Sequence, residues 1–288
     1  MDVLNATIIN KTMDRNDLFT EEGLREQAAI NELIRTIYSH GLAQSSWVGT
    51  LPDAAPQRGE IVREPLERLG IDQRRDYEPL PGAADDARTP WFLYWEIFWV
   101  LHVTRPFLKP GARILDAGGA SSLFSCYLAS LGYDVDTVDL NEKLIANNNA
   151  IARRMGWNSR AVAMNLAKLD YPDNSFDHVY SICVFEHLDF PIKQAALKEI
   201  ARCLKPGGIF ALTFDYRNPA PGVLGVGKDP RPINQISSAA DLQRTFLTDP
   251  RLEVFGNAEF RDSGTSYLSH PKFNYAPYTF GSLFLRKK

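Results

Sequence analysis

ILDAGGA, residues 114–120, is the stretch that decides the fold, and TVDLNE follows it at residues 137–142. The first stretch predicts a buried strand that runs into a turn of small residues and then into a helix. A turn without bulky side chains lets backbone N–H groups approach a ligand closely. The second stretch ends a neighbouring strand in Asp139, where a carboxylate can accept hydrogen bonds from two ribose hydroxyls. Together they predict a pocket for a nucleoside-bearing cofactor at the carboxyl ends of parallel strands.

Length, charge and cysteine content exclude several classes of protein. The chain has 288 residues, 44% of them hydrophobic, and a formal net charge of −3, which gives no electrostatic reason to expect nucleic acid. Cys126, Cys183 and Cys203 show no C-x-x-C spacing, and the first residues lack a signal-peptide pattern. The most apolar run, Trp91–Leu101, is interrupted by Glu96 and is too short to span a bilayer. We therefore expect a cytoplasmic protein that binds neither nucleic acid nor membrane.

Two regions with different patterns divide the chain. Residues 1–110 predict a helical N-terminal cap, with helices over 21–38 and 91–103 and at most a short helix around 63–69. From Ala112 onward, strand and helix patterns alternate, which predicts βαβ units and a mainly parallel sheet. The expected strands cover 112–117, 133–139, 159–164, 176–182 and 208–215, and the expected helices cover 121–131, 141–155 and 191–204.

The pattern changes again after Asp215. Residues 216–237 contain four prolines and predict a cover loop, and a helix is expected near 239–247. Two β-rich runs, 252–261 and 278–285, joined by a short linker, predict an antiparallel pair at the sheet edge. The expected fold class is therefore α/β: a doubly wound, Rossmann-like, mostly parallel seven-stranded sheet with an antiparallel C-terminal hairpin in residues 111–288, plus the helical cap.

Four motifs in a fixed order resemble those of a known family. They are ILDAGGA, TVDLNE, LDYPDNSFDHVYSICVFEHL over 169–188 and LKPGG over 204–208. In this order they resemble the class I S-adenosylmethionine-dependent methyltransferases, in a small-molecule branch similar to the ubiquinone methyltransferases. The resemblance covers Ala112 to about Tyr216 and the final hairpin. The glycine turn departs from the family's G-x-G-x-G, because Ala120 and Ser122 hold the second and third glycine places.

The resemblance implies S-adenosylmethionine as the cofactor, with S-adenosylhomocysteine as its product. Asp116 would order the turn and reach the methionine amino group, and Gly118 and Gly119 would line the methionine portion. Asp139 would hold the ribose hydroxyls. A cap at the end of a strand is the alternative for Asp116.

The resemblance also implies residues around the adenine and the methyl group. Leu140 would pack on the adenine face, and Leu166 would offer its backbone amide to the ring. Asn165 would accept the adenine amino group, although an ordinary turn asparagine is the alternative. Cys183 would frame the mouth at which the methyl group points, although a small packing residue is the alternative.

The acceptor side of the site is less defined by the sequence. Because a sulfonium methyl is already electrophilic, transfer to an oxygen or nitrogen needs a general base only if the acceptor arrives protonated. The candidate bases are His187 and His270, and for His187 the alternative is an anchor for the next helix. The candidate acceptor-binding residues are Tyr216, Asn218, Trp95 and Tyr275. The aromatic run that contains Trp95 is equally typical of a structural helix between cap and sheet.

The remaining expectations concern metals, assembly and other functions. Glu186 and His187, adjacent in sequence, make a poor Mg²⁺ site, so we expect no metal. The acceptor is expected to be a small molecule, and the protein a monomer or homodimer. Two alternatives stay open: a non-catalytic binding or scaffold protein on the same fold, and an NAD-dependent oxidoreductase, which the absence of G-x-G-x-x-G disfavours.

Overall fold

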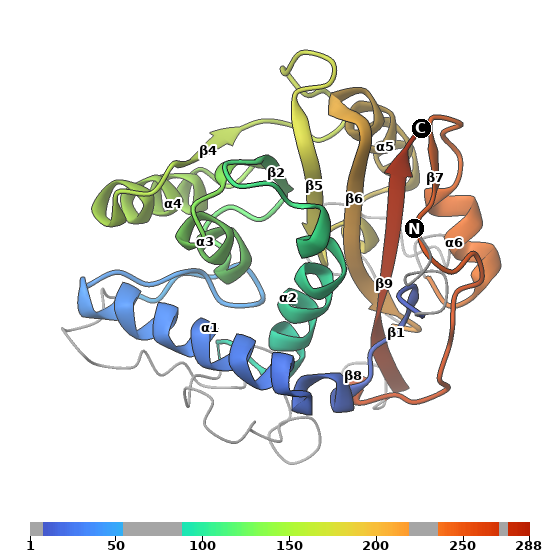
Figure 1. Ribbon diagram of the computed structural model, residues 1–288, viewed down its shortest axis with the longest axis horizontal. Helices are drawn as coiled ribbons and strands as arrows, with labels where there is room; N and C mark the ends of the chain where they lie inside the picture. The colour runs from blue at the N-terminus through green and yellow to red at the C-terminus, as the bar shows by residue number, and fades with distance from the viewer. Residues whose placement is uncertain (1–7, 54–87, 219–235, 271–275) are drawn as a thin grey trace.

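A single twisted sheet organises the computed structural model, which describes residues 8–53, 88–218, 236–270 and 276–288. Its strand order is β1-β9-β6-β5-β2-β3-β4, and β7 and β8 also pair with β9 (Figure 1). Strands β2 to β6 run parallel to their neighbours among themselves, whereas β1, β6, β7 and β8 are antiparallel to β9. The strands are β1 Lys11–Thr12, β2 Arg113–Ala117, β3 Asp134–Asp139, β4 Ser159–Ala163, β5 Phe176–Ile182, β6 Leu204–Tyr216, β7 Leu252–Val254, β8 Leu268–His270 and β9 Ala276–Lys287.

The predicted α/β fold class is confirmed. Seven strands follow one another as β4-β3-β2-β5-β6-β9-β7, and the two short strands β1 and β8 extend this arrangement. The expectation of a short linker between the last two β-rich runs is wrong. Strand β7 ends at Val254, and Gly256 with φ +85° turns the chain away from β9, so the run expected to continue to Arg261 is broken and Arg261 forms a single bridge with Lys11 of β1. Strand β8 then lies between β7 and β9 in the sequence.

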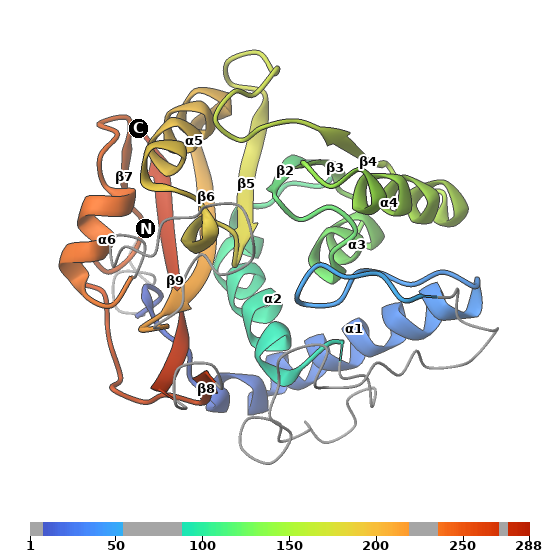
Figure 2. The same cartoon turned by 180° about the vertical axis from the view of Figure 1, so that it is seen from behind.

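Helices cover both faces of the sheet. On one face lie α2 (Trp91–Thr104) and α3 (Leu123–Ser130), with α1 (Glu21–Ser39) packed against them. On the other face lie α5 (Phe190–Cys203) and α6 (Ala239–Phe246). Figures 1 and 2 show α2 and α5 on opposite sides of β5 and β6. Along β6, Ile209 and Ala211 face the first layer and Phe210 and Leu212 the second, as the alternation of a strand requires.

Helix α2 is buried on almost every side. Its N-cap residue is Pro90, which cannot donate a backbone hydrogen bond, and the helix that follows is apolar all round. At its far end the Thr104 hydroxyl donates to the Val100 carbonyl at 2.6 Å and pairs with the Tyr180 hydroxyl at 2.7 Å. None of the helices in the described ranges is both long and apolar enough to cross a bilayer.

The N-terminal region contributes to the sheet itself. Strand β1 pairs with Gly281 and Ser282 of β9, and the Asn10 amide donates to the carbonyls of Phe255 and Asn257, both at 2.8 Å. The side-chain oxygen of Asn10 accepts from the Phe284 N–H at 2.8 Å. The cap expected over residues 1–110 therefore shares hydrogen bonds and core with the rest. The short helix expected at 63–69 and residues 219–235 of the expected cover loop lie outside the described residues.

A second region of the leader packs beside the glycine turn. The backbone N–H of Ser45 donates to the Ser121 carbonyl at 2.7 Å, and Asn147 of α4 (Glu142–Met155) donates from its amide to Ala43 at 2.8 Å. Asn147 also donates to the Ser121 hydroxyl at 2.6 Å. These contacts fix the backbone between the turn and α3 from the outside.

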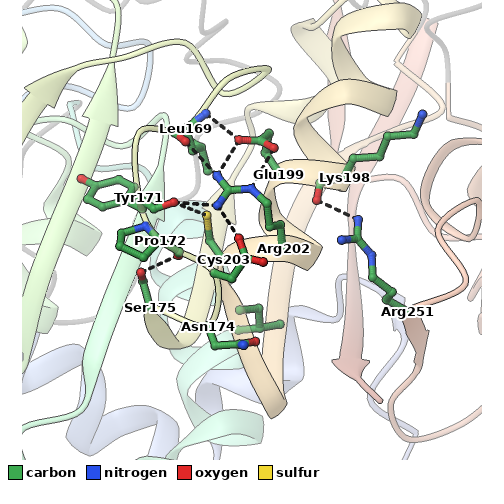
Figure 3. Close-up of polar contacts among 12 residues, drawn as sticks. Leu169, Tyr171, Pro172, Asn174, Ser175, Lys198, Glu199, Arg202, Cys203 and Arg251 are labelled. Atoms are coloured by element: carbon green, nitrogen blue, oxygen red, sulfur yellow. Dashed lines mark hydrogen bonds and ion pairs between the residues drawn. The ribbon is translucent and has the colours of Figure 1, made fainter.

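One arginine holds the loop that leads into β5. The Arg202 guanidinium donates to the carbonyls of Leu169 and Tyr171, at 2.8 and 2.6 Å (Figure 3). It also donates to Asp173 at 2.9 Å. Glu199, one turn earlier on α5, accepts from the same guanidinium at 2.8 Å and also from the Leu169 N–H. The DNSFD motif thus enters β5 at a fixed register against α5.

Candidate functional site

The glycine turn follows β2 and leaves no room for side chains. Gly118 has φ +89°, and its N–H donates to the Val138 carbonyl at 2.9 Å. A Cβ at Gly118 would lie 2.6 Å from a methyl of Val184, and a Cβ at Gly119 would overlap the Asp116 carboxylate. Both positions therefore require glycine, even though the motif departs from the usual spacing.

Asp116 lies under this turn with one oxygen in use. Its side chain is 1% exposed, and Ser122, the N-cap of α3, donates weakly to Oδ2 at 3.4 Å. Oδ1 is buried and lacks a hydrogen-bond partner in the part of the chain that the structure describes. Burial raises the pKa of Asp116 to about 7. A buried carboxylate in this state is suited to an incoming cation, such as an ammonium group.

Asp139 ends β3 one strand away. Its Oδ1 accepts from the backbone N–H groups of Leu140 at 2.7 Å and Asn141 at 2.9 Å, and burial raises its pKa. Leu140 is 66% exposed, so an apolar surface stands open beside this carboxylate. The structure thus brings together Asp116, Gly118, Gly119, Asp139 and Leu140 at one edge of the sheet, around the ends of β2 and β3.

Asn165 and Leu166 follow β4. Asn165 is exposed, and its Oδ1 accepts from the Ala167 N–H at 2.9 Å, so the side chain forms a turn with its own backbone. This geometry is what the turn alternative predicts. Leu166 is 8% exposed and packs into the core on the α5 side. Their contact with an adenine ring stays a prediction.

A second set of polar side chains gathers where β5 and β6 end. Cys183 follows β5 with φ +49°, an unusual value for a residue with a side chain. Its thiol donates to Glu96 Oε1 at 2.7 Å, and the Thr213 hydroxyl donates to the same oxygen at 2.7 Å. Glu96 comes from α2 and is 3% exposed. Sequence reasoning treated Glu96 only as a break in an apolar run, although a lone carboxylate in such a run is itself a signal.

Glu186 and Asp215 complete this set. Glu186 Oε1 accepts from the Asp215 N–H at 2.9 Å, whereas Oε2 is buried with no partner among the described residues. Asp215 Oδ2 accepts from the Asn218 amide at 2.6 Å. Burial, more than any neighbour, raises the pKa of Glu96 to about 8 and the pKa values of Glu186 and Asp215 to about 7 each. We call Glu96, Cys183, Glu186 and Asp215 the acidic cluster.

The acidic cluster bears on the expectation of no metal. Ligand atoms of Cys183, Glu186 and Asp215 all lie within 4.8 Å of one another, which a metal ion could exploit. The sequence suggested only Glu186 and His187 for such a role. The fold places Cys183 and Asp215 beside Glu186, and the absence of a bound metal stays a prediction.

The two candidate bases occupy different places. His187 ends a short 3-10 turn, Phe185–His187, and its Nδ1 is buried without a partner in the described ranges. Burial lowers its pKa, while the charge of Asp215 opposes that shift. His270 is the last residue of β8. Because the charge of Asp215 acts on His187, this histidine lies near the acidic cluster.

The three candidate acceptor-binding residues that the structure describes, Trp95, Tyr216 and Asn218, are not brought together. Trp95 is fully buried, stacks on Trp99, and donates its indole N–H to Asp17 at 2.8 Å, so its contacts are those of a packing residue. Tyr216 is 2% exposed and packs on aromatic side chains. Asn218 lies beside the acidic cluster through its bond to Asp215. Tyr275 lies outside the described residues.

Comparison with known proteins identifies the central segment. Residues 115–212 match a family model described as a methyltransferase domain. A sterol 24-C-methyltransferase of Gibberella zeae is 33% identical over 108 residues, covering 36% of this chain and 28% of that protein. A ubiquinone biosynthesis O-methyltransferase of Xanthomonas campestris is 33% identical over 119 residues, covering 41% of this chain and 48% of that protein. The chain thus spans about half or less of the length of these relatives.

A solved structure extends the likeness beyond the central segment. The [4+2]-cyclase SpnF superposes with a TM-score of 0.54 at 19% identity, covering 77% of this chain and 90% of that one. At this level of identity the likeness concerns the fold. The residues that the family model matches, 115–212, include Asp116, Gly118, Gly119, Asp139, Cys183 and Glu186, but not Glu96 or Asp215.

Proposed function

Because residues 115–212 match the family model of a methyltransferase domain, we propose that this protein transfers a methyl group from S-adenosylmethionine to a small-molecule acceptor. The observation that carries the proposal is the proximity of the glycine turn and Asp116, whose Oδ1 has no partner among the described residues, to Asp139 at the end of the adjacent strand. The relatives named above support the same reaction class.

The residues present fit the cofactor. The Asp116 Oδ1 atom, which has no partner among the described residues, supplies an acceptor for the methionine ammonium, and Gly118 and Gly119 carry no side chain that would cover the backbone of the turn. We assign Asp139 to the ribose hydroxyls and Leu140 to one face of the adenine. When bound, the cofactor supplies an electrophilic methyl group on a sulfonium. The chain's part is to hold the two reactants aligned, which can remove about 7–11 kcal/mol of barrier.

The acceptor site lies, in this proposal, at the acidic cluster. The relatives are named for transfer to a carbon and to an oxygen, so their names leave the acceptor atom open. Our proposal is transfer to an oxygen or nitrogen, with Asn218 and His187 near the acceptor. The free thiols of Cys126, Cys183 and Cys203 favour a reducing compartment such as the cytoplasm. A monomer or homodimer is proposed for its assembly.

A second function keeps some support. SpnF is named as a cyclase, so a fold of this kind can serve a reaction other than methyl transfer. A binding protein that retains the cofactor without turnover would show the same donor site. The NAD-dependent alternative has no such support, because the turn lacks the spacing for a dinucleotide.

Two measurements test the proposal. Calorimetry should show binding of S-adenosylhomocysteine and none of NAD, and binding of NAD alone would exclude the proposed cofactor. Radiolabelled S-adenosylmethionine incubated with the protein and a metabolite extract should give a labelled small molecule. Donor binding without any labelled product would favour the binding-protein alternative.

A further inference from the structure

We propose that the methyl acceptor is an amine, which binds as an ammonium ion against Glu96, Glu186 and Asp215, so that this site performs N-methylation. The proposal rests on the proposed function and specifies its substrate class. Its basis is the acidic cluster, whose carboxyls come from α2, from the turn after β5 and from the end of β6.

Negative groups outnumber positive ones around the cluster. Glu96 is influenced by Glu186 and Asp215, and both neighbours raise its pKa. The one lysine that acts on Glu186 is Lys193 of α5, and burial lowers the pKa of that lysine to about 8. His187 faces Asp215, but burial lowers its pKa as well. Burial holds these carboxyls toward their protonated forms, and a cationic ligand beside them would favour the ionised forms instead.

An unpartnered oxygen points independently to a missing donor. Glu186 is fully buried, its carboxylate lies in the group whose atoms are within 4.8 Å of one another, and its Oε2 has no partner in the described residues. Leaving such an acceptor unpaired costs about 1–3 kcal/mol, and more when it is charged. An ammonium ion carries several N–H donors. Two acceptors about 2.8 Å from one tetrahedral nitrogen are separated by about 4.5 Å, which suits the carboxylate oxygens of Glu186 and Asp215, within 4.8 Å of one another.

The hydrogen bonds inside the cluster leave room for an added donor. The Cys183 thiol and the Thr213 hydroxyl both donate to a single oxygen, Glu96 Oε1. Burial and the neighbouring carboxyls raise the pKa of Cys183 well above its usual value, so the thiol stays neutral and remains a donor. Cys183 and Asp215 are partly exposed, so a ligand can reach the cluster from that side.

The cluster also adjoins the donor site. Strand β5 pairs with β2, and Val184, next to Cys183, packs where a Cβ of Gly118 would stand. The glycine turn would line the methionine portion of the donor in the proposed function. An amine held by the acidic cluster would then approach the methyl group from the β5 and β6 side.

The chemistry balances with the groups at hand. Glu186 Oε2 accepts one proton from the ammonium ion, which leaves a neutral amine with a free lone pair. The amine nitrogen forms a bond to the methyl carbon while the carbon–sulfur bond breaks, and the sulfur keeps that electron pair as a thioether. The product is an N-methylated ammonium, and the proton on Glu186 passes to solvent. A carboxyl whose pKa is raised to about 7 is suited to accept and release a proton near neutral pH.

The test compares amines with matched alcohols, using the full chain. Radiolabelled S-adenosylmethionine is offered with a panel of small primary and secondary amines and with alcohols of the same carbon skeleton. Labelled product is expected from amines alone. Glu186→Gln should lower kcat/KM for the best amine by about 100-fold, which corresponds to about 2.8 kcal/mol. Glu253→Gln, the same change at an exposed position on β7, should leave it unchanged.

A binding measurement distinguishes failure of the amine proposal from failure of the proposed methyltransferase function. The amine panel should raise the Tm of the wild-type complex with S-adenosylhomocysteine, and Glu186→Gln should abolish that rise while it retains affinity for S-adenosylhomocysteine. If S-adenosylhomocysteine still binds, three outcomes would overturn the amine proposal alone: labelled alcohols, label on a carbon atom of the acceptor, or no labelled amine. So would a stoichiometric metal ion bound by the cluster and required for activity. Failure to bind S-adenosylhomocysteine would overturn the proposed function as well.

Discussion

At the scale of single residues, Asp139 gives the most direct test of the donor site. We expect Asp139→Ala to weaken binding of S-adenosylhomocysteine by about 10- to 100-fold, because the ribose hydroxyls would lose their acceptor. The matched control is Asp134→Ala at the other end of β3, which should leave the affinity unchanged. Titration calorimetry measures both. An unchanged Kd in Asp139→Ala would show that the ribose does not bind at this strand end.

Glu96 gives a test that depends on pH. Burial raises its pKa from 4.5 to about 8, so between these values the folded protein holds a proton that the unfolded chain releases. Stability from this group is therefore present below pH 4.5 and lost as pH rises toward 8, by at most about 1.4 kcal/mol per pH unit.

Glu96→Gln should remove this dependence while its amide oxygen still accepts from Cys183 and Thr213. We expect the variant to gain stability relative to the wild type between pH 5 and pH 8, measured by urea unfolding at several pH values. Glu253→Gln should follow the wild type throughout. Parallel pH profiles for Glu96→Gln and the wild type would show that Glu96 is ionised at neutral pH.

Residue types in motifs were predictable from the sequence, whereas partners across the fold were not. Asp116 and Asp139 follow apolar runs, and that pattern alone places them at strand ends. Glu96 and Cys183 lie 87 positions apart in the sequence, so no local pattern links the two. Trp95 was a candidate for the acceptor site because aromatic residues serve both packing and binding, and its bond to Asp17 shows a packing role.

At the scale of elements, Arg202 connects α5 to the loop before β5. We expect Arg202→Ala to lower the free energy of unfolding by about 2–4 kcal/mol, because two backbone carbonyls and Glu199 lose a charged donor. Arg153→Ala on the exposed side of α4 should change it by less than about 0.5 kcal/mol. Urea unfolding measures both variants. A loss as small as that of the control would mean that the loop holds its position without Arg202.

The five parallel strands were predictable because segments with strand patterns alternate with segments of helical pattern from Ala112 onward. The last β-rich runs were harder, since 252–261 reads as one strand by composition. Gly256 and the hydrogen bonds of Asn257 with the leader divert the chain after Val254. Such a contact with the other end of the chain cannot be read from local sequence.

At the scale of the whole molecule, Asn10 joins the leader to the final strands. We expect Asn10→Ala to lower the free energy of unfolding by about 2–3 kcal/mol, because it leaves the carbonyls of Phe255 and Asn257 and the N–H of Phe284 without their side-chain partner. Asn158→Ala, at an exposed position before β4, is the control. Donor affinity in folded Asn10→Ala should equal that of the wild type. A wild-type unfolding midpoint would mean that β1 alone holds the leader in place.

The pairing of β1 with β9 has a consequence for biosynthesis. Asn10 and its partner Phe284 are separated by 274 positions, so the leader leaves the ribosome long before the strand that it completes. The nascent polypeptide must therefore carry the apolar face of its early segments uncovered until translation passes residue 287. Chains on ribosomes stalled before that codon should still be cleaved by proteases and bound by chaperones as incompletely folded polypeptides.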